Sequence, residues 1–396
     1  MRAGKVLEQF VFKLMTNGLP QTLKSTADLL PFRRALLAWY HKHHRPLPWR
    51  QTHDPYAIWV SEIMLQQTQV TTVIEYYERF LGRFPTVRSL ADAPEQEVLT
   101  LWAGLGYYRR ARQMHVAAKE IVQQQGDVFP ATFNEVRALP GVGRYTAGAI
   151  VSFAYGHRAP ILEANTLRLY SRLIGLREDP KSASSQQLLW RFADHLLPKT
   201  GANIGKVNQA LIELGSLVCT PKRPNCAVCP VKRFCATYRG GLQAEIPRLP
   251  APQTYTPLHH ALVVVHRGKK TLMRQNPAGR WWAGLWDFPR IDLTELGWHQ
   301  EFDRAEPHLM LQVGLVEQAM QQALGLELRE ATSEYLTTVK HGVTRYRIAL
   351  HCFRAMLRPA ARLPPPHTWQ WVDLAIEPQL PFTSTAQKLR RWLLTQ

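Results

Sequence analysis

Four of the five cysteines lie close together in the chain, at spacings typical of a metal site. They are Cys219, Cys226, Cys229 and Cys235, in the pattern C-x6-C-x2-C-x5-C, whereas Cys352 is remote. Four thiolates at this spacing suit either a tetrahedral zinc ion or an iron–sulfur cluster, and the spacing alone does not choose between them. We therefore expect a metal centre in a reducing compartment rather than a disulfide framework.

Basic residues stand between these cysteines, and Lys222 and Arg223 are adjacent to each other. A loop whose two ends are fixed by metal thiolates holds such cations in a defined place, where they suit the phosphates of a nucleic acid. The loop is therefore predicted to contact DNA as well as to hold the metal.

A glycine-containing turn offers a second phosphate site. The sequence Leu139-Pro140-Gly141-Val142-Gly143-Arg144 joins two predicted helices, the first of which opens with a capping box at Thr132–Glu135. Both glycines are expected to let the backbone approach a ligand closely, and the N–H groups at the start of the second helix suit an anion. The alternative is an ordinary helical corner in which glycine only supplies a left-handed conformation.

The charge of the chain favours a polyanionic partner. Among 396 residues, Lys+Arg 49 against Asp+Glu 30 gives a net charge of +19 and a pI near 10.0, which indicates nucleic acid or an anionic membrane surface. The longest strongly apolar runs, such as Ala261–Val265, have the length of a strand and not of a membrane span. A composition that is 45% hydrophobic and 20% charged excludes a wholly disordered or fibrous chain.

Two regions of different periodicity must position these groups. Residues 31–236 show helical spacing, and Ile63, Val70, Ile74 and Tyr77 are predicted to share one helical face. The region is therefore expected to be a mainly α domain.

The rest of the chain is predicted to be a leader, a linker and a second domain. Residues 1–30 fit no pattern and are taken as a leader of unknown role, and residues 237–258 are rich in proline and glycine, as in a stiff linker. Residues 259–396 contain strand-like runs at 262–266 and 346–353 and an amphipathic helical stretch at 316–324. This mixture indicates an α+β domain.

Several motifs in the first domain resemble those of the adenine DNA glycosylase family, MutY, among the helix-hairpin-helix DNA glycosylases. They are Leu47–Arg50, Trp59–Thr68, Trp102–Tyr108, Leu139–Ile150, Ile161–Asn165 and the four-cysteine pattern. The resemblance implies one [4Fe-4S] cluster per chain, held by the four cysteines in the loop 219–235. A looser resemblance at Gly284–Pro289 implies a Nudix-like C-terminal domain for lesion recognition. The segment Gly314–Ala319 lacks the clustered glutamates of a Nudix hydrolase, so no hydrolase activity is expected there.

The same resemblance implies the chemistry. A family member flips adenine out of duplex DNA opposite 8-oxoguanine or guanine and hydrolyses its glycosidic bond. Glu62 corresponds to the general acid that protonates adenine at N7, and Glu163 replaces an aspartate that faces the developing positive charge on the sugar. Tyr145 stands where strand-cutting relatives carry a lysine nucleophile, so base removal without strand cleavage is expected. The alternative for Glu62 is an exposed glutamate in a first helical turn.

Binding residues are implied in the same way. The adenine pocket is expected to contain Trp49, Arg50 and Gln209. The DNA-binding residues are expected to be Arg45, Leu47, Gln67, Thr68, Leu105, Tyr107, Gly141, Gly143, Lys222 and Arg223, with Gln67 and Tyr107 as wedges in the base stack. The lesion reader is expected at Val343, Thr344 and Arg345, where the family has Phe-Ser-His; the alternative is that Thr344 and Arg345 are ordinary exposed strand residues.

Two other interpretations remain open. A bifunctional glycosylase/lyase like endonuclease III would share the hairpin and cysteines but would need lysine at Tyr145. A slow or non-catalytic DNA-binding paralogue is favoured by the change at Glu163. We further expect a monomer that binds no membrane and lies in a bacterial cytoplasm, associated with the nucleoid through DNA.

Overall fold

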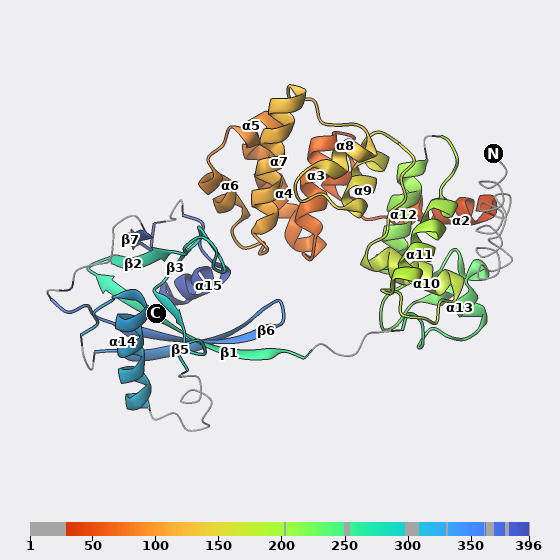
Figure 1. Cartoon of the computed structure of the whole chain (residues 1–396). Helices are drawn as coiled ribbons and strands as arrows, with labels where there is room; N and C mark the ends of the chain where they lie inside the picture. The colour runs from red at the N-terminus through yellow and green to blue at the C-terminus, as the bar shows by residue number, and fades with distance from the viewer. Residues whose placement is uncertain are drawn as a thin grey trace. The chain divides into compact units, whose positions relative to one another are not determined.

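The computed structural model describes residues 29–201, 203–248, 254–297, 309–329, 332–359, 361, 368–376 and 380–395. The chain divides into two compact units, Met1–Asp92 with Gln113–Ala251 and Ala93–Arg112 with Pro252–Gln396 (Figure 1). The segment Ala93–Arg112 thus groups with the second unit although the sequence predicted it within the first domain. None of the helices in the described part of the chain is long and apolar enough to cross a membrane.

Helices make up the first unit. They are α2 (Leu29–His43), η2 (Pro48–Arg50), α3 (Pro55–Leu65), α4 (Val70–Arg83), α5 (Val87–Ala91), most of α7 (Arg109–Gln125), α8 (Phe133–Ala138), α9 (Arg144–Ala154), α10 (Ala164–Ile174), α11 (Ala183–Leu196), α12 (Ile204–Leu217), η3 (Cys226–Val228), η4 (Lys232–Phe234) and α13 (Ala236–Arg239). The capping box predicted at Thr132–Glu135 opens α8 as expected. The expected leader, 1–30, lies outside the described residues except for Leu29 and Leu30, which begin α2.

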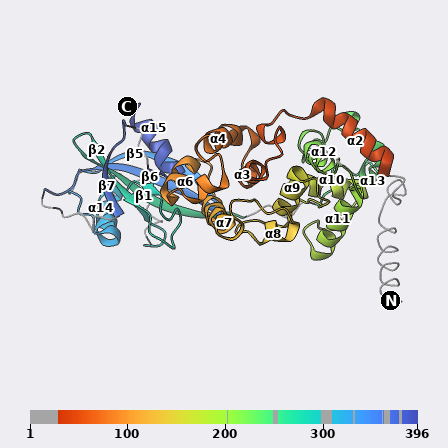
Figure 2. The same ribbon diagram turned by 90° about the horizontal axis from the view of Figure 1, so that it is seen from above.

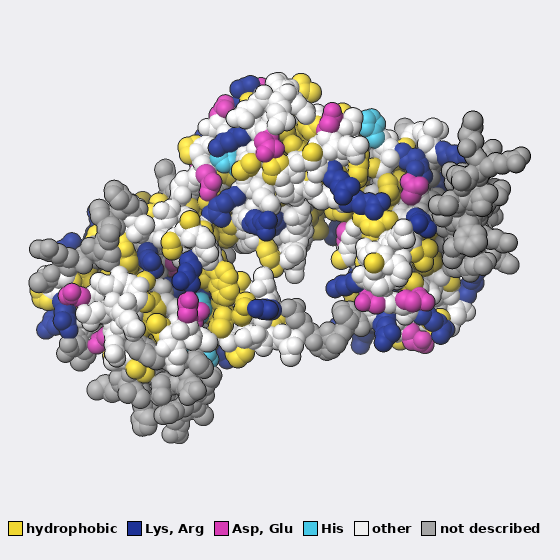
Figure 3. Space-filling model, viewed as in Figure 1, with side chains coloured by type: hydrophobic (Ala, Val, Ile, Leu, Met, Phe, Trp, Pro, Cys, Tyr) yellow, Lys and Arg dark blue, Asp and Glu magenta, His cyan; other side chains and the backbone are white. Residues whose placement is uncertain are grey.

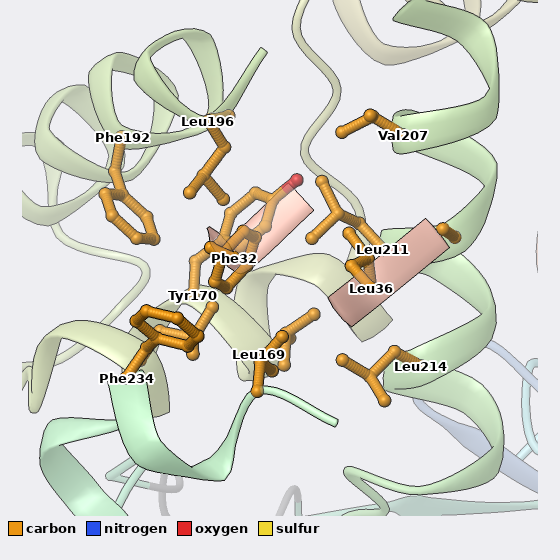
Figure 4. Close-up of a cluster of buried hydrophobic side chains, with 14 of the residues drawn as sticks. Phe32, Leu36, Leu169, Tyr170, Phe192, Leu196, Val207, Leu211, Leu214 and Phe234 are labelled. Atoms are coloured by element: carbon orange, nitrogen blue, oxygen red, sulfur yellow. The ribbon is translucent and has the colours of Figure 1, made fainter. Parts of the chain in front are cut away.

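Helix α12 lies at the centre of one helical group. It contacts α2, α9 and α10, and Figures 1 and 2 show α2, α10 and α11 around it. Figure 4 shows the core that these helices enclose, with side chains from α2, α10, α11, α12 and η4 pointing toward one another. Phe32 packs edge-on against Phe234 with ring centroids 5.6 Å apart. The N-terminal helix and the cysteine loop therefore share one core.

The predicted single face of Ile63, Val70, Ile74 and Tyr77 is wrong, because two helices replace one. Helix α3 ends at Leu65 and α4 begins at Val70. The polar stretch Gln66–Gln69 between them contains Gln67 in a left-handed conformation, φ 57°, which no continuous α-helix accommodates.

A seven-stranded mixed sheet forms most of the second unit. Its strands are β1 (Thr256–Arg267), β2 (Lys270–Gln275), β3 (Trp286–Asp287), β4 (Arg290–Asp292), β5 (Glu334–Val343), β6 (Tyr346–Ala355) and β7 (Trp369–Asp373), and its helices are α6 (Glu95–Trp102), α14 (Leu309–Leu324) and α15 (Ser384–Leu393). The order is β3-β2-β1-β6-β5, with β4 on β1 and β7 on β2. Strands β1 and β6 run parallel.

The alternation of β1 distributes its side chains between two cores. Val263 and Val265 face the core that contains α14 residues, whereas Leu262 and Val264 face the core that contains α15 residues. A strand that is apolar on both faces must be covered on both.

Helix α14 is also tied to the residues that precede β5. The carboxylate of Glu317 accepts a hydrogen bond from the Ser333 hydroxyl at 2.7 Å.

Part of the predicted linker, 237–258, is folded. Helix α13 begins at Ala236, and Thr237 and Ile246 are buried in the first unit. The Ile246 carbonyl accepts a hydrogen bond from Arg172 Nε at 2.7 Å, and β1 begins at Thr256. An isolated apolar residue such as Ile246 is thus buried against the first unit, which the proline-rich composition of the segment does not reveal.

Candidate active site

The first unit contains a pocket of about 470 Å³ where α3, α12 and the first turns of α9 and α10 meet. Many of the predicted site residues line it together: Arg45, Leu47, Trp49, Arg50, Glu62, Gln67, Thr68, Tyr145, Glu163 and Gln209. These residues come from segments up to about 160 positions apart in the chain, so the fold gathers them in one place. Trp49 forms part of the wall and is itself held edge-on by Tyr77, with ring centroids 5.4 Å apart.

Glu62 lies buried in the middle of α3. The helix starts at Pro55, and the Asp54 side chain accepts a hydrogen bond from the Tyr56 amide at 3.0 Å. The alternative of an exposed first-turn glutamate is therefore wrong, since Glu62 is two turns further on and only 5% exposed.

The surroundings of Glu62 favour its neutral form. Burial raises the pKa of its carboxyl to about 7, although a hydrogen bond from Tyr145 opposes the shift. Its Oε2 atom has no hydrogen-bond partner among the described residues. A buried acid with one unpaired oxygen beside a pocket can hold a proton near neutral pH and give it to a ligand.

Tyr145 is the second residue of α9, and its position depends on the glycine turn. Gly141 has φ 77°, and a Cβ there would lie 2.9 Å from Gln113 Cβ. Gly143, in contrast, has an ordinary φ of −88° as the N-cap of α9, so only Gly141 needs the left-handed conformation that glycine allows. Burial, followed by the charges of Glu62 and Glu163, raises the pKa of Tyr145 well above its usual value. The phenol therefore stays protonated.

Glu163 is the N-cap of α10. Its Oε2 accepts a hydrogen bond from the Asn165 amide and its Oε1 one from the Thr166 amide, both at 2.8 Å. Burial raises its pKa, and these two hydrogen bonds oppose the shift. A Cβ on Gly215 would lie 2.8 Å from the Asn165 carbonyl oxygen, so glycine lets α12 approach this first turn. The carboxylate is thus fixed by the helix that it caps.

Glu213 is the charged residue that the sequence analysis missed. It is fully buried and pairs with Arg45 at 2.8 Å and Arg50 at 2.6 Å. Burial opposes its ionisation, but the hydrogen bonds from the two arginines outweigh this effect and lower its pKa to about 2. The signal in the sequence is its position as the single acidic residue of α12. Both guanidinium groups are therefore oriented by a carboxylate rather than left free to attract phosphate.

The side-chain amide of Gln209 is also fixed by a hydrogen bond. The Tyr40 hydroxyl donates a hydrogen bond to its Oε1 atom at 2.9 Å. Because this carbonyl oxygen is engaged, the amide NH2 group remains to donate to a ligand in the pocket.

The remaining predicted DNA-binding residues, Leu105, Tyr107, Gly141, Gly143, Lys222 and Arg223, do not line the pocket, whereas Gln67 does. Gln67 and Tyr107, the two predicted wedges, both have left-handed backbones, φ 57° and φ 49°, and the Tyr107 side chain is 49% exposed. Such strained, exposed positions are concentrated at functional sites. Leu105 is buried, whereas Lys222 and Arg223 are exposed. Figure 3 shows Lys and Arg side chains spread over the visible face of each unit.

All four clustered cysteines line one small cavity. Burial raises the pKa of Cys229 to about 12, with a smaller contribution from the other three thiols. Arg172, a second buried residue that sequence analysis missed, donates from Nη1 to Cys219 Sγ at 3.3 Å. Among the described residues, no three or more His, Cys, Asp or Glu side chains lie close enough together to hold a metal ion. The four thiols around this cavity nonetheless have the chemistry of the soft ligand set that iron–sulfur clusters use.

The three predicted lesion-reader residues form the tip of the β5–β6 hairpin. Thr344 and Arg345 are exposed turn residues, with φ 49° at Thr344, and Arg345 Nη2 donates to the Tyr346 hydroxyl at 2.9 Å. The alternative of ordinary strand residues is therefore wrong for these two, because Val343 pairs directly with Tyr346. A two-residue turn presents both side chains outward.

Comparison with known proteins agrees with this architecture. The HhH-GPD superfamily base excision DNA repair profile matches residues 60–195, and the NUDIX domain profile matches residues 260–391. An adenine DNA glycosylase of Buchnera aphidicola (subsp. Schizaphis graminum) is 35% identical over 262 residues, which cover 66% of this chain and 75% of that protein. The chain belongs to the adenine DNA glycosylase family. The predicted fold class, a helical helix-hairpin-helix glycosylase domain followed by a Nudix-like domain, is confirmed.

The mammalian adenine DNA glycosylases that the chain matches are longer than this chain. The rat protein is 36% identical over 327 residues, which cover 69% of this chain and 63% of the rat protein. The chain therefore spans less than two thirds of its mammalian relatives. Among solved structures, a thermostable thymine-DNA glycosylase is 28% identical, with a TM-score of 0.49, over 53% of this chain and 95% of that one.

Proposed function

We propose that this member of the adenine DNA glycosylase family removes adenine from duplex DNA by hydrolysis of its N-glycosidic bond. The observation that carries the proposal is the buried Glu62 carboxyl, whose pKa of about 7 lets it hold a proton beside a pocket that Glu163 also lines. One acid that is neutral and one carboxylate that faces a developing cation are what this reaction requires. The family's adenine-specific relatives support adenine as the base.

The geometry of the pocket supports the following roles. Glu62 donates its proton to N7 of the flipped adenine, which makes the base a better leaving group. Glu163, held by the amides of Asn165 and Thr166, supplies negative charge beside the sugar as it becomes oxocarbenium-like. Tyr145 holds the Glu62 carboxyl in place through its hydrogen bond and provides no amine, so the strand stays intact after base removal.

The substrate is proposed to be adenine opposite 8-oxoguanine or guanine. Gln67 and Tyr107 would enter the base stack, and the hairpin tip of Val343, Thr344 and Arg345 would contact the opposite base. The exposed turn and its donor-rich guanidinium support this role, because guanidinium donates to carbonyl oxygens and phosphates. A monomer in the bacterial cytoplasm remains part of the proposal.

A panel of duplexes tests the proposal against its two alternatives. Full-length protein is mixed in excess with duplexes that carry A opposite 8-oxoguanine, G or T, and strand breaks are scored before and after alkali. We expect alkali-dependent breaks with A opposite 8-oxoguanine and G and far fewer with A opposite T. Breaks without alkali would indicate the glycosylase/lyase, and tight binding without breaks would indicate the non-catalytic paralogue.

The pH dependence of base removal should report Glu62. Since burial raises its pKa to about 7, the acid is protonated below this pH, and the single-turnover rate should fall about tenfold per pH unit above it. The Tyr145 hydrogen bond lowers this pKa, so Tyr145→Phe should move the falling limb to higher pH. A limb that stays in place in Tyr145→Phe, measured on the same duplex, would contradict the assignment.

The cysteine loop is proposed to hold one [4Fe-4S] cluster with a structural role, because its four thiols line one cavity and the family resemblance implies this cluster. The spacing alone leaves zinc open. Anaerobically purified protein should be brown and contain about four irons per chain. Cys226→Ala should lose most of the iron, whereas Cys352→Ala, at a buried cysteine of strand β6, should keep it. Stoichiometric zinc in place of iron would contradict the cluster.

The hairpin tip should set the preference for the opposite base. Arg345→Ala should reduce the ratio of rates for A opposite 8-oxoguanine and A opposite G by about tenfold, the value of one good charged hydrogen bond. Base removal from A opposite G should change little. Arg354→Ala, which removes an exposed arginine further along β6, is the matched control. An unchanged ratio in Arg345→Ala would remove this residue from lesion recognition.

A further inference from the structure

The loop that carries Tyr107 contains three residues in a left-handed conformation. Helix α6 ends at Trp102 and α7 begins at Arg109. Between them, Gly104, Gly106 and Tyr107 have φ angles of 107°, 73° and 49°. Glycine adopts such angles readily, whereas a tyrosine with a positive φ is strained and persists only where its surroundings hold it. Contacts around the loop must therefore keep Tyr107 in this conformation.

Arg110, in the first turn of α7, supplies such contacts from inside the protein. The residue is only 8% exposed. Its Nη2 atom donates to the carbonyl oxygen of Gly106 at 3.0 Å and to that of Leu105 at 3.4 Å. Its Nε atom donates to the carbonyl oxygen of Tyr107 at 3.4 Å. Three successive carbonyl groups of the loop thus face one guanidinium, whose planar set of donors suits several acceptors at once.

The same guanidinium lies close to two aromatic rings. Its central carbon is 5.3 Å from the centroid of the Trp102 ring and 5.7 Å from that of the Tyr107 ring. A cation at this distance is attracted to an aromatic face, and Arg110 keeps its charge at neutral pH because burial lowers its pKa only to about 10. Trp102 is fully buried, whereas the Tyr107 ring is open to solvent. Arg110 therefore connects a ring of the core to the ring of the exposed tyrosine.

The ends of the loop have anchors of their own. The Gly104 amide donates to the Tyr108 hydroxyl at 3.2 Å, and this hydroxyl donates to the Phe382 carbonyl oxygen at 3.2 Å. The Trp102 indole Nε1 donates to the Gly106 carbonyl oxygen, also at 3.2 Å. These contacts do not involve the Arg110 side chain. A change at Arg110 is thus expected to alter the placement of Tyr107 more than the fold of the loop.

We propose that Arg110 is a positioning residue that holds the Tyr107 ring in the orientation from which it enters the base stack. The proposal rests on the wedge role of Tyr107 in the proposed function. A wedge that is already ordered loses less conformational freedom when it enters the stack, so base flipping is faster. Arg110 therefore acts on base flipping, through Tyr107, and not on cleavage of the glycosidic bond.

Stopped-flow fluorescence of 2-aminopurine placed beside the target adenine tests the proposal, because this base brightens when its neighbour leaves the stack. Full-length protein is mixed in excess with a duplex that carries A opposite 8-oxoguanine. Arg110→Lys keeps the charge but loses the planar set of donors, and it should slow the fluorescence rise about tenfold, as loss of one charged hydrogen bond does. Tyr107→Ala should slow the rise at least as much. In the Tyr107→Ala protein, Arg110→Lys should have no further effect.

Two further variants serve as control and as second probe. Arg109→Lys makes the same change at an exposed neighbour and should flip the base at the full rate. Gly106→Ala alters the loop without touching the core, since a Cβ there meets nothing within 4 Å but φ 73° is unfavourable for alanine. It should also slow the rise, and only while Tyr107 is present. This variant carries the test if thermal unfolding shows that Arg110→Lys does not fold.

The outcomes separate the proposal from the function on which it rests. If Tyr107→Ala slows the rise but Arg110→Lys, or Gly106→Ala in its place, leaves it unchanged, the positioning role is overturned and the wedge role stands. Equal slowing with and without Tyr107 also overturns the positioning role, because a merely structural effect does not depend on the wedge. An unchanged rise in Tyr107→Ala overturns the wedge role and the proposal with it.

Discussion

Glu62→Gln is expected to lower the single-turnover rate of adenine release by about a thousandfold, in the range that general acid catalysis contributes. The amide keeps the shape of the carboxyl group but has no transferable proton. The side chain is buried, with its Oε2 atom unpaired among the described residues, so no solvent acid can easily replace it. Duplex binding, measured by fluorescence anisotropy, should change little.

Glu78→Gln provides the matched control, because Glu78 is an exposed residue of the neighbouring helix α4. It should keep the full rate. Activity in Glu62→Gln within about tenfold of the unmodified protein would remove Glu62 from the role of general acid.

Glu163 should show the second largest effect, and the length of its side chain should matter less than its charge. Glu163→Gln is expected to slow adenine release by at least about a hundredfold, since it removes the charge that faces the sugar. Glu163→Asp should react at about the rate of the unmodified protein or faster. Aspartate is a favourable N-cap, so it can keep the contacts with the amides of Asn165 and Thr166.

The two Glu163 variants together decide how the pocket accommodates the longer acid. A chemically dead Glu163→Asp with an unchanged thermal unfolding temperature would show that the pocket has been rebuilt around glutamate, because a displacement of about 1 Å can cost a hundredfold in a preorganised site. Gln186→Ala, in the remote helix α11, controls for substitutions that alter only local hydrogen bonds.

The sequence predicted those helices and strands whose signal lies in a few neighbouring residues. The capping box at Thr132–Glu135, the strand-like runs in β1 and β6 and the two domain types follow from spacing and composition. The break between α3 and α4 was missed because apolar spacing continues across Gln66–Gln69, and a left-handed Gln67 has no signature in the sequence.

The candidate site was predicted from family motifs, and its supporting residues were not. Glu213 acts through its contact with Arg50, and Tyr40 acts through its contact with Gln209. The two residues of each pair lie more than 160 positions apart in the chain. Arg172 reaches the cysteine loop from another helix in the same way. Such partners depend on tertiary packing, so neither periodicity nor spacing reveals them.

The most direct test of the central claim is the base released from a duplex with A opposite 8-oxoguanine. The full-length protein is incubated in excess over the duplex, and free bases are separated by chromatography while the strand is examined before alkali. We expect free adenine equal to the amount of duplex processed, with the strand intact until alkali is added. No free adenine from a duplex that the protein binds, or release of a different base, would contradict it.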